Sequence, residues 1–508
     1  MNCPKGISEE TRMRVSTIMF AKQTIHYSCA KHNSRKQSLQ LILKKVITMK
    51  LYNTMTRTKE EFKPVTEGEV KMYSCGPTVY NYFHLGNARP FIVFDCLRNF
   101  FEYLGYKVTF VQNFTDVDDK LINKSKEEGI TVQEIADKYI KEYFIDAKGL
   151  GIREATIHPR ATENIDAIIE IISTLIEKGH AYEVDGDVYF SVKSDPNYGK
   201  LSHKPLDDLM EGVRKDLEEG KRDAADFALW KKRKDDEIGW ESPWGIGRPG
   251  WHIECSAMVN KYLGKTIDIH SGGVDLVFPH HENEIAQSEC ANGCTFANYW
   301  MHNGFIKVNN EKMNKSLNNF FTVRDIAAQY DYEVIRFFML SAHYRSPINF
   351  SDELMDAAKS SLERMYNCLD NLAFLAKSAT DGEVDESIKS AMDSYKAKFV
   401  EAMEDDLNTA DAIAAIFEAV RYINGKEGMN KATLNYAEST ISEIGGVLGL
   451  LQNRKSDDLD SEVEALIEER QAARKAKNFA RADEIRDYLK DKGIVLEDTP
   501  QGVKWRKA

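Results

Sequence analysis

Short apolar runs and helical patterns alternate in the first part of the chain. Residues 70–74 and 108–112, the second within KVTFVQNF, predict two strands because β-branched and aromatic side chains are frequent there. Between them, residues 88–104 alternate apolar and polar side chains at helical spacing. A strand, a helix and a second strand in this order predict a β-α-β unit, the start of a parallel sheet. A later run, residues 267–271, predicts a further strand of that sheet.

This pattern is interrupted between residues 155 and 246. A helical run (ENIDAIIEIISTLIEKG) precedes two strand-like runs (HAYEVDGDVYFSV) and a charged stretch (DLEEGKRDAADFALWKKRKDDE). Because sheet-like runs resume afterwards, we interpret residues 155–246 as an insertion into one α/β domain, which comprises residues 49–154 and 247–321.

The remainder of the chain is nearly all helical in pattern. Runs such as LERMYNCLDNLAFLA and AIAAIFEAVRYI place apolar residues three and four positions apart and predict a helical bundle over residues 322–452. A polar linker covers residues 452–461. Residues 462–508 are expected to form a small C-terminal module with two charged helices and a strand-like end. The predicted fold class is α/β: a parallel-sheet domain with an insertion, followed by the bundle and this module.

Composition agrees with a multidomain protein of the reducing cytoplasm. The 508 residues suit several domains, and eight irregularly spaced cysteines do not suggest a disulfide framework. No apolar run approaches the roughly 20 residues that a membrane span needs, so we expect no membrane partner. The net charge of −12 argues against a bulk polyanion binder but is compatible with a local basic groove.

Residues 1–48 differ from the rest, with nine Lys or Arg, two Asp or Glu and no clear periodicity. Three interpretations stay open: a wrongly chosen upstream start codon, a transit-peptide-like leader, or a genuine appendage. We expect this extension to be disordered or not part of the native protein.

Two short motifs suit the phosphates of ATP. His84-Leu-Gly-Asn87 follows a predicted strand and opens a predicted helix, whose N-terminus favours an anion. Gly86 lets the backbone approach a ligand closely, and His84 can donate to a phosphoryl oxygen as charge develops there. Asn87 can donate a hydrogen bond but carries no charge. Taken alone, the tetrapeptide also fits an ordinary turn.

The second motif is Lys312-Met-Asn-Lys-Ser316, which follows a strand-like run and a polar turn. Lys312 and Lys315 are compact positive charges suited to the oxygens of a triphosphate bound with Mg²⁺. An isolated Lys-x-x-Lys is more often a solvated basic loop.

Together, the run YSCGPTVYNYFHLGN over residues 73–87 and the KMNKS motif resemble the paired signatures of class I aminoacyl-tRNA synthetases, His-Ile-Gly-His and Lys-Met-Ser-Lys-Ser. Asn87 and Asn314 stand where His and Ser are commoner. The resemblance covers about residues 49–508 and implies a Rossmann-like catalytic domain. It also implies catalytic and ATP-binding roles, which fall on His84, Gly86, Asn87, Lys312, Lys315 and Ser316.

Four further residues narrow the resemblance to the cysteinyl-tRNA synthetase family: Cys75, Cys255, His280 and Glu284. In that family they imply one Zn²⁺ per chain, and two thiolates, an imidazole and a carboxylate suit this ion. Without the resemblance, the same pattern fits buried structural thiols and a helix-capping histidine. We expect the neighbouring His281 and Glu282 to point elsewhere and to support the site or the fold, and the nearby Cys290 and Cys294 not to be ligands.

The resemblance implies a ligase that acts on L-cysteine, ATP and tRNA(Cys). It would form cysteinyl-adenylate and pyrophosphate and then transfer the cysteinyl group to the 3′ end of the tRNA. Zinc would bind the substrate thiolate and so reject serine. We expect a monomer. A related ligase that joins cysteine to an amino sugar and a non-catalytic RNA-binding paralogue are the alternatives.

The remaining candidates carry over more loosely. The amino-acid pocket is expected to contain Cys75, Gly76, Thr115 and Trp251. Adenosine is expected at Gly272, Gly273 and Asp275, of which Asp275 could instead cap a helix. The acidic cluster Asp116, Asp118 and Asp119 could meet the substrate ammonium or be a solvated helix start. In the module, Trp505 could stack on an unpaired anticodon base.

Overall fold

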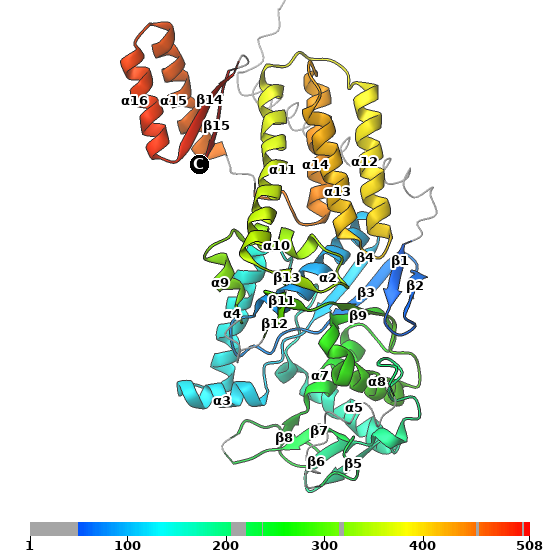
Figure 1. Cartoon of the computed structure of the whole chain (residues 1–508). Helices are drawn as coiled ribbons and strands as arrows, with labels where there is room; N and C mark the ends of the chain where they lie inside the picture. The colour runs from blue at the N-terminus through cyan, green and yellow to red at the C-terminus, as the bar shows by residue number, and fades with distance from the viewer. Residues whose placement is uncertain are drawn as a thin grey trace, which may run out of the picture.

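The computed structural model describes residues 49–204, 220–235, 237–313, 320–453, 457–499 and 502–507. The extension 1–48 and the motif residues Lys315 and Ser316 lie outside these ranges. At the centre is a four-stranded parallel sheet in the order β10-β9-β3-β4 (Figure 1). Its strands are β3 (Glu69–Ser74), β4 (Lys107–Gln112), β9 (Ile267–Gly273) and β10 (Ala297–Asn303).

Helix α2 (Leu85–Tyr103) connects β3 to β4 and buries most of its residues, as expected for a crossover helix. The predicted β-α-β unit is thereby confirmed, with the helix starting three residues earlier than the pattern indicated. Because all four strands run parallel, their carboxyl ends meet at one edge of the sheet, where ligands bind in open α/β folds. Helices α3 (Asp119–Glu128) and α4 (Val132–Gly149) follow β4, and an N-terminal hairpin precedes β3, formed by β1 (Lys50–Asn53) and β2 (Thr58–Glu61).

The inserted region has its own antiparallel sheet and its own core. That core includes Ile168, Ile172, Phe190 and Trp230, all fully buried. Its last strand lies just beyond the expected boundary at residue 246. The elements are α5 (Ile165–Glu177), β5 (Ala181–Val184), β6 (Asp187–Phe190), β7 (Phe227–Lys232) and β8 (Gly247–Pro249). The chain then returns to the central sheet through α7 (Trp251–Tyr262), and α8 (Glu282–Asn292) links β9 to β10.

A helical bundle stands on the opposite side of the central sheet from the insertion (Figure 1). Its helices are α11 (Asp352–Ser378), α12 (Glu386–Glu404), α13 (Thr409–Asn424) and α14 (Lys431–Val447). A junction precedes it, made of β11 (Ile306–Val308), β12 (Glu311–Lys312), α9 (Val323–Ala327), α10 (Tyr332–Leu340) and β13 (Ile348–Phe350). Strand β13 was expected to be helical. Three residues are too few to show a period, and β13 owes its conformation to parallel pairing with β11.

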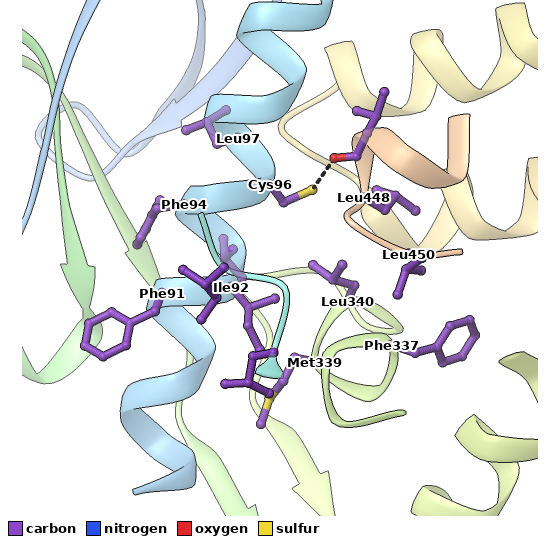
Figure 2. Packing of buried hydrophobic residues seen from close by; sticks show 14 of the residues in the cluster. Phe91, Ile92, Phe94, Cys96, Leu97, Phe337, Met339, Leu340, Leu448 and Leu450 are labelled. Atoms are coloured by element: carbon purple, nitrogen blue, oxygen red, sulfur yellow. Dashed lines mark hydrogen bonds between the residues drawn. The ribbon is translucent and has the colours of Figure 1, made fainter. Parts of the chain in front are cut away.

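The bundle and the sheet domain share one hydrophobic core. Figure 2 shows α2 packed against the end of α10 and the turn after α14, through residues such as Ile92, Leu340 and Leu448. The Cys96 thiol there lies 4.0 Å from the Val447 carbonyl oxygen. This shared core packs the bundle against α2, the crossover helix that begins at the candidate phosphate site.

The C-terminal module has a separate small core, which includes Val463, Ile485 and Leu489. Its first helix starts at Asp457, before the expected start at residue 462. The elements are α15 (Asp457–Lys475), α16 (Phe479–Asp491), β14 (Ile494–Thr499) and β15 (Gly502–Lys507). Across the described parts of the chain, none of the helices combines the length and the apolar character needed to cross a membrane.

Candidate active site

The four predicted metal ligands meet at the carboxyl edge of the sheet. Cys75 follows β3, Cys255 lies in the first turns of α7, and His280 and Glu284 flank the start of α8. All four side chains are buried. The two sulfurs lie 4.0 Å apart, Cys255 Sγ lies 3.7 Å from His280 Nε2, and Cys75 Sγ lies 3.5 Å from Glu284 Oε1.

These separations fit a tetrahedral metal site. Metal–ligand bonds of about 2.0–2.3 Å place neighbouring ligand atoms roughly 3.3–3.8 Å apart. The ligand atoms of Cys75, Cys255, His280 and Glu284 all lie within 4.8 Å of one another. Two sulfurs, one nitrogen and one carboxylate oxygen are therefore close enough together to share one cation. His280 Nε2 lies 2.9 Å from Glu284 Oε1, within ion-pair distance.

The electrostatics of the cluster also favour a cation. A hydrogen bond from the Cys75 thiol lowers the pKa of Cys255 to about 6, although burial opposes this. Burial raises the pKa of Cys75, and the adjacent Cys255 adds to the rise. Burial alone would lower the pKa of His280, but Glu284 and Cys255 raise it to about 10. The cluster thus presents buried negative charge that a proton on His280 only partly offsets.

Two more histidines line the cluster, and the prediction that His281 points elsewhere is wrong. His281 Nε2 lies 3.3 Å from Cys75 Sγ, and His270 Nε2 lies 2.7 Å from Glu284 Oε2. Together with Cys75 and Glu284 they form a second group of four possible ligands. Sequence reasoning missed His270 because it lies inside a strand, where a histidine carries no motif. Glu282 does point away and accepts hydrogen bonds from the Gly199, Leu201 and Ser202 amides of the insertion.

Residues expected in the amino-acid pocket surround this cluster. The Trp251 indole is 43% exposed and stacks on the His280 ring, with 4.2 Å between centroids. Gly76 packs so tightly that a Cβ would lie 1.6 Å from the Asn113 carbonyl oxygen, so only glycine fits after Cys75. The Thr115 hydroxyl is buried and donates to Glu254 Oε2 at 2.7 Å.

Asn113 and Glu254 were not found from the sequence. Asn113 Oδ1 accepts from the Gly76 amide at 2.9 Å and lies 4.0 Å from Cys255 Sγ. Asn113 Nδ2 lies 3.5 Å from Thr115 Oγ1. Burial raises the pKa of Glu254 well above its usual range, and Cys255 contributes further. These two residues join the ends of β3, β4 and α7 around the pocket.

The neighbouring acidic cluster has structural partners. Asp116 accepts from the Thr162 amide and hydroxyl, and Asp118 caps α3 through the Lys120 amide. Asp119 pairs with Lys231 and Arg248 of the insertion. Of the two interpretations, the helix start fits Asp118, and Asp116 and Asp119 have partners within the fold.

The described residues on either side of positions 314–319 lie beside the first signature motif. His84 is the N-cap of α2, and its Nδ1 accepts from the Asn87 amide at 3.3 Å. The Leu85 amide donates to the Phe321 carbonyl, just after the KMNKS segment. Within that segment, Met313 Cε would lie 3.1 Å from a Cβ on Gly86. Lys312 ends β12, which pairs with β11.

The two glycines at the end of β9 leave almost no room for a side chain at their positions. A Cβ on Gly272 would lie 2.8 Å from Leu276 Cδ1, and one on Gly273 would lie 2.4 Å from Asp275 Oδ1. Asp275 is in the first turn of the short helix Val274–Leu276, whose N-cap is Gly273. The cap interpretation of Asp275 is therefore wrong, and its contribution to ribose binding stays a prediction.

Comparison with known proteins decides the family. Residues 61–360 match the model of the tRNA synthetases class I (C) catalytic domain. The chain is 57% identical to the cysteine–tRNA ligase of Clostridioides difficile (strain 630) over 465 residues, which are 90% of this chain and 100% of that protein. This chain belongs to the cysteine–tRNA ligase family. Cysteine–tRNA ligase features continue to its end: residues 398–452 match a DALR domain, and residues 456–506 match the cysteinyl-tRNA ligase anticodon binding domain.

Solved structures of other synthetases share the fold. Methionyl-tRNA synthetase from Mycobacterium tuberculosis, in complex with methionyl-adenylate, superimposes with a TM-score of 0.56 at 16% identity, covering 75% of this chain and 89% of that chain. A putative arginyl-tRNA synthetase from Campylobacter jejuni gives 0.52 at 12% identity, covering 76% and 94%. The cysteine–tRNA ligase assignment therefore agrees with a class I synthetase architecture.

Proposed function

We propose that this chain forms cysteinyl-adenylate from L-cysteine and ATP at the carboxyl edge of its sheet and transfers cysteine to the 3′ end of tRNA(Cys). The observation that carries the proposal is the buried cluster of Cys75, Cys255, His280 and Glu284 at the carboxyl edge of the sheet. Family membership supports the same reaction.

Cys75, Cys255, His280 and Glu284 would hold Zn²⁺. Bound there, the ion would keep the substrate thiol as a thiolate and favour sulfur over the hydroxyl of serine. Trp251 stacks on His280 and so shields one ligand from water. Gly76 allows the close approach of backbone that keeps Cys75 against the end of β4.

The phosphates of ATP and their Mg²⁺ would lie at the N-terminus of α2. There His84, Gly86 and Asn87 offer a ring nitrogen, a close backbone approach and an amide, next to the strand that ends in Lys312. Lys312, Lys315 and Ser316 would neutralise the triphosphate, and Gly272, Gly273 and Asp275 would receive adenosine. We expect the enzyme to act as a monomer in the cytoplasm.

The test is cysteine-dependent exchange of pyrophosphate into ATP, followed by charging of tRNA(Cys). We expect exchange without any tRNA and no exchange with serine. Deleting residues 457–508, which form a separate core, should preserve exchange and sharply weaken charging. Charging at the full-length rate by the shortened protein, or exchange that requires an amino sugar, would contradict the proposal.

A further inference from the structure

Glu254 is a buried carboxylate that no cation of the described ranges accompanies. It is 1% exposed and lies in α7 between Trp251 and Cys255. Among the described residues, no Lys, Arg or His forms an ion pair with it, whereas the buried Glu284 has His270 and His280. A buried carboxylate is costly unless a cation or hydrogen bonds stabilise it. Within the described ranges, the hydrogen bond to its side chain comes from the hydroxyl of Thr115.

That bond fixes what the Thr115 hydroxyl can do. A threonine hydroxyl has one proton to donate and two lone pairs to accept with. The proton lies toward Glu254 Oε2, at 2.7 Å, and Asn113 Nδ2 approaches the oxygen from 3.5 Å. Any further partner must therefore donate to this oxygen. A hydroxyl polarised by a carboxylate suits an ammonium and disfavours a second carboxylate.

Asn113 connects the Thr115 hydroxyl to the thiol cluster. Asn113 links it to the Gly76 amide, which follows Cys75, and lies 4.0 Å from Cys255 Sγ. The other acidic groups nearby are occupied: Asp116 by Thr162, and Asp119 by Lys231 and Arg248. Among these buried or capped carboxyl groups, Glu254 is the one hydrogen-bonded to the Thr115 hydroxyl.

We infer that Glu254 is a positioning residue that makes the Thr115 hydroxyl the acceptor for the α-ammonium of the substrate. This inference rests on the proposed function, which places Thr115 in the amino-acid pocket. It orients the substrate with its thiol at the cluster and its amino group at the end of β4. It also makes the pocket select for an amino group and not only for a thiol.

The test uses three thiols and the full-length zinc-loaded protein. Cysteine has both an amine and a carboxylate, cysteamine lacks the carboxylate, and 3-mercaptopropionate lacks the amine. Dissociation constants are measured by calorimetry under reducing conditions, with zinc content checked for each variant. We expect Glu254→Gln to weaken cysteine and cysteamine about ten- to one-hundredfold and to leave 3-mercaptopropionate within about twofold.

Asp116→Asn is the matched control, because Asp116 is also a buried carboxylate that accepts from a threonine hydroxyl. It should not change the ratio of the cysteine and 3-mercaptopropionate affinities. Thr115→Val, which removes the hydroxyl, should show the same selective loss as Glu254→Gln. Thr115→Ser, which keeps the hydroxyl, should retain the affinities of the unaltered protein. An equal loss for all three thiols, or unchanged cysteine binding, would overturn the inference. Failure of the unaltered protein to bind cysteine would overturn the proposed function and this inference with it.

Discussion

The helical bundle and the carboxyl edge of the sheet both contain buried side chains, but those side chains differ in kind. In α11, the buried residues Leu362, Met365, Leu369, Leu372 and Ala376 recur every three or four positions and contact other apolar groups. At the sheet edge, the buried groups are thiols, imidazoles and carboxylates. Apolar burial stabilises a fold by itself, whereas a buried cluster of charges costs free energy unless a ligand compensates it. The difference indicates that the edge is arranged for binding.

The largest difference between the two regions should appear when a buried cysteine of each is replaced by serine. Cys255→Ser should abolish zinc binding and adenylate formation, because a hydroxyl is a poor ligand for this ion. Cys368→Ser in α11 should retain one zinc and full exchange activity, at some cost in stability, because that thiol is buried in the bundle. Metal analysis and pyrophosphate exchange on both variants check this. Retention of zinc by the Cys255 variant would refute the ligand assignment.

A cavity made in the bundle should lower the stability of the protein and leave its zinc content and activity unchanged. Leu369 is fully buried in α11, so Leu369→Ala should lower the free energy of unfolding by about 2–5 kcal/mol. Zinc content and the exchange rate at a temperature well below the unfolding transition should not change. Chemical denaturation, alongside the exchange assay, measures both. A loss of exchange activity comparable to that of Cys255→Ser would mean that the two regions are not separable.

Much of this comparison could be predicted from the sequence. The three- and four-residue spacing in α11 and the apolar runs at β3 and β4 are local patterns, and the structure confirms the elements they predicted. Motifs also led to Cys75 and Cys255, which are 180 positions apart and nonetheless have their sulfurs within 4.0 Å. Whether any of these residues binds a metal or a nucleotide stays a prediction.

Other features could not be predicted, because they arise only from long-range contacts. His270, Asn113 and Glu254 belong to no local pattern, and their partners come from other strands and helices. Strand β13 is three residues long and forms against β11, some forty positions away. Such residues become visible only once the parallel strands bring their carboxyl ends together.

A smaller and more specific effect is the number of protons that the cluster releases when it binds zinc. In metal-free protein at pH 7.5, Cys255 and Glu284 are ionised, since the pKa of Cys255 is lowered to about 6 and that of Glu284 lies well below its usual range. Cys75 and His280 hold protons, because their pKa values are raised. Zinc binding should therefore release about two protons, and affinity should rise with pH. Calorimetry in buffers of different ionisation enthalpy gives the number. Proton uptake, or affinity that falls as pH rises from 6 to 8, would contradict this charge distribution.

The most direct test of the central claim is the number of sulfur atoms bound to zinc, measured by X-ray absorption at the zinc edge with and without L-cysteine. Cys75 and Cys255 predict two sulfur neighbours in the free protein, and substrate binding through its thiolate predicts a third. Serine at the same concentration should leave the count at two. A spectrum without sulfur neighbours, or a count that cysteine does not change, would contradict the account.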